Sequence, residues 1–349
     1  MATFIRFRAR RTATQATHFG GRWRGVPLAL ALTLMVALAA CGGTGSPAPS
    51  TAAAPSPTAT AAPTAPPTTA PPTTAPAFPV AISDDEGTVV SIAAEPQRIV
   101  SLTPAATEIL FAIGAGDRVV AKVEDINPWP PEADGLPVVA TYQGVDVEQI
   151  VALRADLVIA GGLSFTPPNA VNQLRSLGIP VVVLYAESID EALAGIRAIG
   201  IATGEAAAAA DLSTATRTEM DRLAALTAGL DRPTTFYEID ATTDIYTVPA
   251  DSLYAELLIL AGADPITTDA SYQISLEQLI TANPSVILLG DGGYTTAADV
   301  ASRPGWSGIQ AVIDGNIAVV DDALITRPGP RLVDGLRALI RALHPEVLP

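Results

Sequence analysis

From Phe78 onward, short unbroken apolar runs alternate with longer stretches of helical character. Such runs, separated by helices, are typical of parallel strands that helices cover on both faces of a sheet. An α/β fold is therefore expected. The predicted strands lie at 98–102, 157–160, 181–184, 235–239, 286–289 and 318–320.

The residues on either side of the first strand predict a hairpin and a helix. Residues 78–92 alternate between apolar and polar and contain an Asp-Glu-Gly-Thr turn sequence, which indicates a β-hairpin. Thr103 and Pro104 mark the start of a helix, because proline suits the first helical turn. Gly114 lies just past its predicted end, so this helix is expected to run through Ile113.

A long alanine-rich stretch occupies the middle of the chain, at 189–230. Gly204 is expected to interrupt it, and the Asp-Arg-Pro sequence at 231–233 is expected to end it. A long helix at 205–230 would join the parts before and after it as a stiff spine.

An internal repeat flanks this predicted helix. Residues 145–159 and 274–288 place apolar and polar residues at the same positions, and the pair Glu148-Gln149 matches Glu277-Gln278. A second similarity relates the stretches that begin at Glu108 and at Glu256. Helix-then-strand units of α/β proteins also look alike by chance, but a shared Glu-Gln pair in register favours a true repeat.

The repeat predicts two pseudo-symmetric α/β lobes, at 78–204 and 231–349, bridged by the rigid helix at 205–230. A ligand cleft is expected between the lobes, because small ligands bind at such interfaces, near the carboxyl ends of strands.

The N-terminus has the features of a bacterial export signal. Six arginines and no acidic residue precede or border an apolar run at 26–37, which is too short for an ordinary membrane-spanning helix. The sequence Leu-Ala-Ala-Cys at 38–41 resembles the lipobox of bacterial lipoproteins. This resemblance implies a signal peptide at 1–40, lipidation of Cys41 and a location outside the cytoplasmic membrane. The alternative is an ordinary secreted protein that has a cysteine at this position.

Composition restricts the partners of the mature chain. Residues 41–77 are mostly Pro, Thr, Ala and Ser and predict a disordered linker. Without the six signal-peptide arginines, 14 basic and 36 acidic residues remain, a net charge of about −22, which argues against nucleic acid or anionic lipid as a partner. Cys41 is the only cysteine, and His344 is the only histidine after residue 40. A His/Cys metal site is therefore not expected, no cofactor is predicted, and any metal would arrive already chelated.

Five stretches follow one another along the chain in a characteristic order: 96–104, 128–133, 142–150, the second Glu-Gln repeat and 327–336. Together they resemble helical-backbone substrate-binding proteins of ABC importers, the class that carries ferric siderophores, haem and cobalamin. In that family, two α/β lobes are bridged by a rigid helix, and one exposed glutamate on each lobe docks onto arginines of the permease dimer.

The resemblance implies roles for two glutamates and several cleft residues. Glu148 and Glu277 match the docking glutamates, although each would also suit the first turn of a helix for its own sake. Flat side chains in loops after strands suit a flat ligand, and Arg327 would pair either with an anionic ligand or with a carboxylate at a helix start. The predicted ligand-binding residues are Trp129, Tyr142, Phe165, Tyr246 and Arg327.

The sequence favours a receptor over an enzyme. Gly114-Ala-Gly116 follows a helix and lacks the third glycine of a dinucleotide site, and the chain has no Gly-x-Ser-x-Gly elbow and no phosphate loop. We predict a lipid-anchored receptor that delivers cobalamin or a ferric siderophore to an ABC permease dimer; the absence of a suitable histidine lowers the expectation of haem. The alternatives are a stalked surface sensor or adhesion protein and, less favoured, a chelatase-like enzyme.

Overall fold

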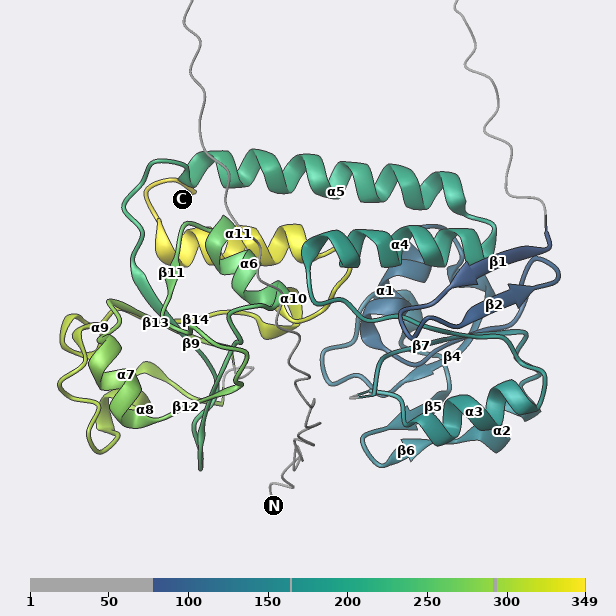
Figure 1. The fold of residues 1–349 in the computed structure, drawn as a ribbon, viewed down its shortest axis with the longest axis horizontal. Coiled ribbons are helices and arrows are strands. Elements are labelled where there is room, and N and C mark those ends of the chain that lie inside the picture. The colour runs from purple at the N-terminus through teal and green to yellow at the C-terminus, as the bar shows by residue number, and fades with distance from the viewer. Residues whose placement is uncertain (1–77, 164, 291–293, 349) are drawn as a thin grey trace, which may run out of the picture. The chain divides into compact units, whose positions relative to one another are not determined.

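The computed structural model describes residues 78–163, 165–290 and 294–348, all within the compact unit Thr69–Pro349 (Figure 1). The predicted signal peptide, Cys41 and the linker at 41–77 lie outside the described residues. Within the described ranges, no helix has both the length and the hydropathy needed to cross a bilayer.

The first lobe contains a two-stranded hairpin and a six-stranded sheet. The hairpin pairs β1 (Val80–Ser83) with β2 (Val89–Ile92) in antiparallel register. The sheet has the order β6-β5-β4-β3-β7-β8, and all neighbours are parallel except β5 and β6. Its strands are β3 (Ile99–Ser101), β4 (Val119–Val123), β5 (Val138–Thr141), β6 (Gly144–Val145), β7 (Leu157–Ala160) and β8 (Val181–Val183).

Local sequence explains the start of the first helix of this lobe. The Thr103 side chain accepts a hydrogen bond from the backbone nitrogen of Ala106 at 3.1 Å, and Pro104 occupies the first helical position. The helices of the lobe are α1 (Pro104–Ala112), α2 (Val147–Ala152) and α3 (Pro168–Ser176), with 3₁₀ turns η1 (Gly116–Arg118) and η2 (Pro131–Ala133).

Two consecutive helices, α4 (Ile189–Thr203) and α5 (Ala206–Thr227), connect the lobes (Figure 1). Gly204 separates them with a φ of 85°, a left-handed conformation that glycine adopts without steric cost. A Cβ on Gly200 would lie 2.2 Å from Cβ of Ala209, so the absence of a side chain lets the two helices pack closely. The largest hydrophobic core contains residues of α1, α4, α5, α6 and α11 and therefore extends through both lobes.

The second lobe contains a six-stranded sheet of order β12-β10-β9-β13-β14, with β11 also paired to β9. The strands β9, β11, β13 and β14 are parallel, whereas β10 is antiparallel to its neighbours. The strands are β9 (Thr234–Asp240), β10 (Ile245–Thr247), β11 (Asp264–Pro265), β12 (Gln273–Ile274), β13 (Val286–Leu289) and β14 (Ile317–Val319). The helices are α6 (Leu253–Leu260), α7 (Leu276–Ala282), α8 (Ala297–Ser302), α9 (Gln310–Asp314), α10 (Asp322–Ile325) and α11 (Leu332–Leu343).

The repeat seen in the sequence is also a repeat of structure. The units β6–α2–β7 and β12–α7–β13 begin and end at equivalent positions of the two repeats. Asp146 and Ser275 cap α2 and α7 in the same way, each accepting from the third helical residue. Arg154 and Asn283, which are also equivalent, share the left-handed conformation, with φ of 53° and 45°. The predicted class, two pseudo-symmetric α/β lobes bridged by a long helix, is confirmed.

Candidate ligand-binding site

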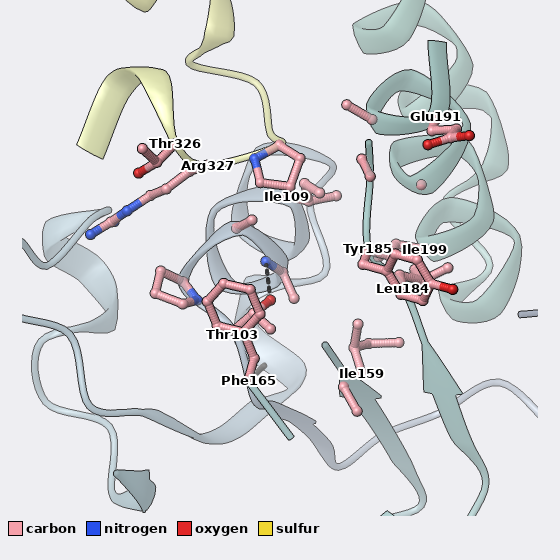
Figure 2. A pocket seen from close by; sticks show the side chains of 18 of the residues that line it. Thr103, Ile109, Ile159, Phe165, Leu184, Tyr185, Glu191, Ile199, Thr326 and Arg327 are labelled. Atoms are coloured by element: carbon pink, nitrogen blue, oxygen red, sulfur yellow. Dashed lines mark hydrogen bonds between the residues drawn. The ribbon is translucent and has the colours of Figure 1, made fainter. Parts of the chain in front are cut away.

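A cavity of about 290 Å³ lies at the carboxyl ends of β3, β7 and β8, where residues of the second lobe close it (Figure 2). Such a position suits a ligand site in an α/β fold. The first lobe and α4 contribute most of the wall. The second lobe contributes Tyr254 from α6 and the segment Thr326–Pro328, which follows α10.

Two glycines after β7 let the walls of the cavity come close together. A Cβ on Gly161 would lie 2.6 Å from Cγ2 of Thr103 and 2.8 Å from Cβ of Phe165. A Cβ on Gly162 would lie 2.9 Å from Cδ1 of Tyr185. The Gly-Gly sequence therefore allows Phe165 and Tyr185 to pack against the backbone at the mouth of the cavity, where both remain exposed.

The hairpin at the start of the first lobe holds Tyr185 in place. The backbone nitrogen of Tyr185 donates to Oδ2 of Asp85 at 2.8 Å, and its hydroxyl donates to the carbonyl oxygen of Asp85 at 3.0 Å. Partial desolvation raises the pKa of the Asp85 carboxyl and of the Tyr185 phenol. The sequence analysis missed Tyr185, although it follows a buried strand, which is the signal that selected Phe165. It also missed Tyr254, for which the sequence has no such signal.

A cluster of buried charges joins the lobes beside the cavity. Glu108 of α1 is fully buried and accepts from Arg327 at 2.9 Å and from Arg331 at 2.6 Å and 3.0 Å. Asp125, which follows β4, accepts two hydrogen bonds from Arg327, at 2.7 Å and 3.0 Å. The guanidinium of Arg331 lies 5.2 Å from the centre of the Trp129 ring, within the range of a cation–π interaction.

The glutamates that match in the second sequence similarity, Glu108 and Glu256, both make contacts across the lobe boundary. Glu108 binds the arginines of the second lobe. Glu256 of α6 accepts from the backbone nitrogen of Ile189, the first residue of α4, at 2.8 Å. The pseudo-symmetry therefore extends to polar contacts that connect the lobes.

The structure brings some of the predicted binding residues together and leaves others apart. Phe165 and Arg327 line the same cavity, and Trp129 lies against Arg331, which shares Glu108 with Arg327. Because two carboxylates neutralise Arg327, an anionic ligand must compete with both of them. Of the two roles expected for Arg327, the observed ion pairs therefore favour pairing with carboxylates of the protein over pairing with an anionic ligand.

The other two predicted aromatics lie outside the lining of this cavity. Tyr142 follows β5, is 77% exposed, and its hydroxyl accepts from Nε2 of the neighbouring Gln143 at 3.2 Å. Tyr246 is half-buried in β10, opposite Asp240 of β9 and Gln273 of β12.

The predicted docking glutamates occupy equivalent and exposed positions. Glu148 is the second residue of α2, and Glu277 is the second residue of α7. Both carboxylates lie in the first helical turn, where the helix dipole favours a negative charge. The structure therefore presents two similar carboxylates, one on each lobe.

Acidic and histidine side chains do not form a metal site in the part of the chain that the structure describes, where no three His, Cys, Asp or Glu residues could hold an ion together. His344 is buried at the end of α11, and its Nε2 lies 3.4 Å from the carbonyl oxygen of Gly262. It is not among the residues that line the cavity.

Comparison with known families gives a match to the periplasmic binding protein model over residues 99–324. The chain belongs to the periplasmic binding protein family. Members of this family bind substrates for transport and are not enzymes, which confirms both the resemblance seen in the sequence and the prediction of a receptor. Family membership also places the folded part outside the cytoplasm.

Individual relatives of this periplasmic binding protein cover most of its length. An uncharacterized ABC transporter substrate-binding lipoprotein, YvrC of Bacillus subtilis, is 34% identical over 276 residues, 77% of this chain and 87% of that protein. The vitamin B12-binding protein of Pectobacterium carotovorum is 31% identical over 242 residues, 68% of this chain and 85% of that protein. The crystal structure of the vitamin B12-binding protein BtuF of Vibrio cholerae is similar, with a TM-score of 0.61 and 27% identity over 71% of this chain and 96% of that one.

Proposed function

We propose that this periplasmic binding protein is a lipid-anchored receptor that captures a metal chelate, cobalamin or a ferric siderophore, and delivers it to an ABC importer permease. The observation that carries the proposal is the cavity that both lobes line, with Phe165, Tyr185 and Tyr254 in its walls. Aromatic surfaces of this kind bind flat, largely apolar ligands.

Charge favours cobalamin over an anionic ferric catecholate. The mature chain carries a net charge of about −22. Arg327 in the cavity wall is already paired with Glu108 and Asp125, and Arg331 is paired with Glu108. A negatively charged chelate would therefore be repelled at long range and would find paired arginines at short range. The names of the relatives from Pectobacterium and Vibrio support the same choice. Haem is less favoured because the sole histidine of the mature chain is buried away from the cavity.

Docking through Glu148 and Glu277 is supported by their structural equivalence. A permease dimer presents the same surface twice, and a pseudo-symmetric receptor can match it with two equivalent carboxylates. Arginine–carboxylate pairs would fix the orientation of the complex.

The lipid anchor is proposed on the sequence at 38–41, in which a cysteine follows three residues of lipobox type. The relative from Bacillus subtilis, which is named a lipoprotein, supports it. Several acyl chains on Cys41 would hold the receptor at the membrane, and the linker at 41–77 would set its reach.

Trp129→Ala is expected to weaken chelate binding about tenfold or more. The half-exposed Trp129 ring packs on Arg331, which shares Glu108 with the cavity residue Arg327, so it offers apolar surface to the part of the chelate outside the cavity. Isothermal calorimetry of the purified chain with cobalamin measures this change. Val89→Ala is the matched control, since Val89 is 70% exposed on the hairpin and does not line the cavity. If wild type and Trp129→Ala bind cobalamin with equal affinity, Trp129 is not part of the ligand-binding site.

A further inference from the structure

We propose that the cavity receives one uncharged aromatic group of about two fused rings that projects from the chelate, while the body of the chelate stays outside it. This inference rests on the proposed capture of a chelate and specifies which chemical class of chelate the site selects. It is carried by the size of the cavity, the chemistry of its walls and the state of the charges at its edge.

The volume of the cavity is too small for a whole metal chelate of tetrapyrrole size. Pockets that enclose drug-sized ligands measure roughly 300–1,000 Å³, and this one measures about 290 Å³. A closed apolar cavity of about 150 Å³ holds one benzene ring. Space for about two rings is therefore present.

The walls suit a flat apolar group. Figure 2 shows Phe165 beside Thr103 on one side of the pocket, and Tyr185 with Leu184 and Ile199 on another. Stacked or edge-on contacts with such rings stabilise an aromatic guest. Small side chains make the space, because the parts of α1 and α4 that face the cavity carry Ala105, Ala106, Ala192 and Gly195.

The charges at the edge of the cavity disfavour an anionic group. Arg327 is paired with Glu108 and Asp125. Burial raises the pKa of Tyr254 to about 12, and partial desolvation with the nearby Asp85 raises that of Tyr185, so both phenols are neutral at physiological pH. The only other ionisable group among the described lining residues is the carboxylate of Glu191, which would repel an anion. A neutral ring meets no such penalty.

Gly195 allows a direct test, because a Cβ built on it has no atom within 4 Å and the residue lines the cavity. The side chain of Gly195→Phe would extend into the space proposed for the aromatic group. Ala194→Phe is the matched control, since Ala194 precedes it on α4 and is exposed away from the cavity lining. Gly195→Leu replaces the phenylalanine variant if that variant does not fold, as judged by circular dichroism.

The variants are titrated, as full chains in mild detergent, with three probes: cobalamin, cobinamide, which keeps the corrin ring but lacks the nucleotide base, and free 5,6-dimethylbenzimidazole. We expect Gly195→Phe to weaken cobalamin binding about tenfold or more, to change cobinamide binding less than about twofold, and to abolish binding of the free base. Ala194→Phe should change none of the three.

Unchanged cobalamin affinity in Gly195→Phe would overturn the proposal, as would an equal loss for cobalamin and cobinamide. If the wild type binds neither corrinoid, the capture of cobalamin fails independently of the cavity. The free base then tests the pocket by itself. If the free base binds to the wild type and this binding is lost in Gly195→Phe, the aromatic pocket is supported. If the free base does not bind to the wild type, the proposal is overturned.

Discussion

Reversing the charge of both docking glutamates, in the double variant Glu148→Arg and Glu277→Arg, is expected to abolish transport while leaving the affinity for the chelate unchanged. Both carboxylates are exposed and lie on α2 and α7, and neither lines the cavity. Removing one partner of a close interfacial charge pair costs about 2–5 kcal/mol, and reversal adds repulsion to that loss. Two such changes leave too little affinity for docking.

The measurement combines uptake of labelled chelate by cells with calorimetry on the purified variant. Asp211→Arg is the control, because Asp211 is exposed on α5 and has no counterpart in the repeat. Each single reversal should reduce uptake by a similar factor, since the two positions are structurally equivalent. Loss of chelate affinity in the double variant, or normal uptake, would contradict the docking assignment.

Glu108→Gln is expected to lower the free energy of unfolding by about 3–5 kcal/mol, because it leaves Arg327 and Arg331 short of a buried counter-charge. The Glu108 side chain is completely buried, whereas both guanidinium groups are mostly buried, so water cannot replace the lost carboxylate. Chemical denaturation followed by circular dichroism measures the change. The melting temperature should fall by on the order of 10 °C.

Glu219→Gln provides the matched control, since Glu219 also binds two arginines, Arg222 and Arg337, but is 27% exposed. Solvent screens this second cluster, so its loss should destabilise the protein much less. If the two variants unfold at the same denaturant concentration, the charge cluster between the lobes does not stabilise the fold in the way proposed.

The sequence was sufficient for elements whose signals are local. Buried strands such as β7 and β13 are unbroken apolar runs, and the cap of α1 is visible as Thr103 followed by Pro104. The match of Glu148 with Glu277 revealed two related lobes because it is repeated in register. Six strands were not predicted: β4, β5, β6, β10, β11 and β12. Four of them, β6, β10, β11 and β12, have only two or three residues, too few to carry a periodic pattern.

The site was less accessible to prediction, because its contacts join residues far apart in the chain. Arg327 lies 202 residues from Asp125 and 219 from Glu108, and neither partner can be chosen from local sequence. The rule that aromatics after strands face a ligand found Phe165 and would have found Tyr185. It also selected Tyr142 and Tyr246, which lie outside the cavity lining, because the rule gives no information on how each loop turns.

The central claim, capture of a metal chelate between the lobes, is tested most directly by equilibrium titration of the purified chain. Cobalamin, a ferric hydroxamate, a ferric catecholate and haem are compared by calorimetry under the same conditions. Tight one-to-one binding of cobalamin, with the hydroxamate next and the catecholate weakest, is the predicted result. Binding of none of the four would contradict the account.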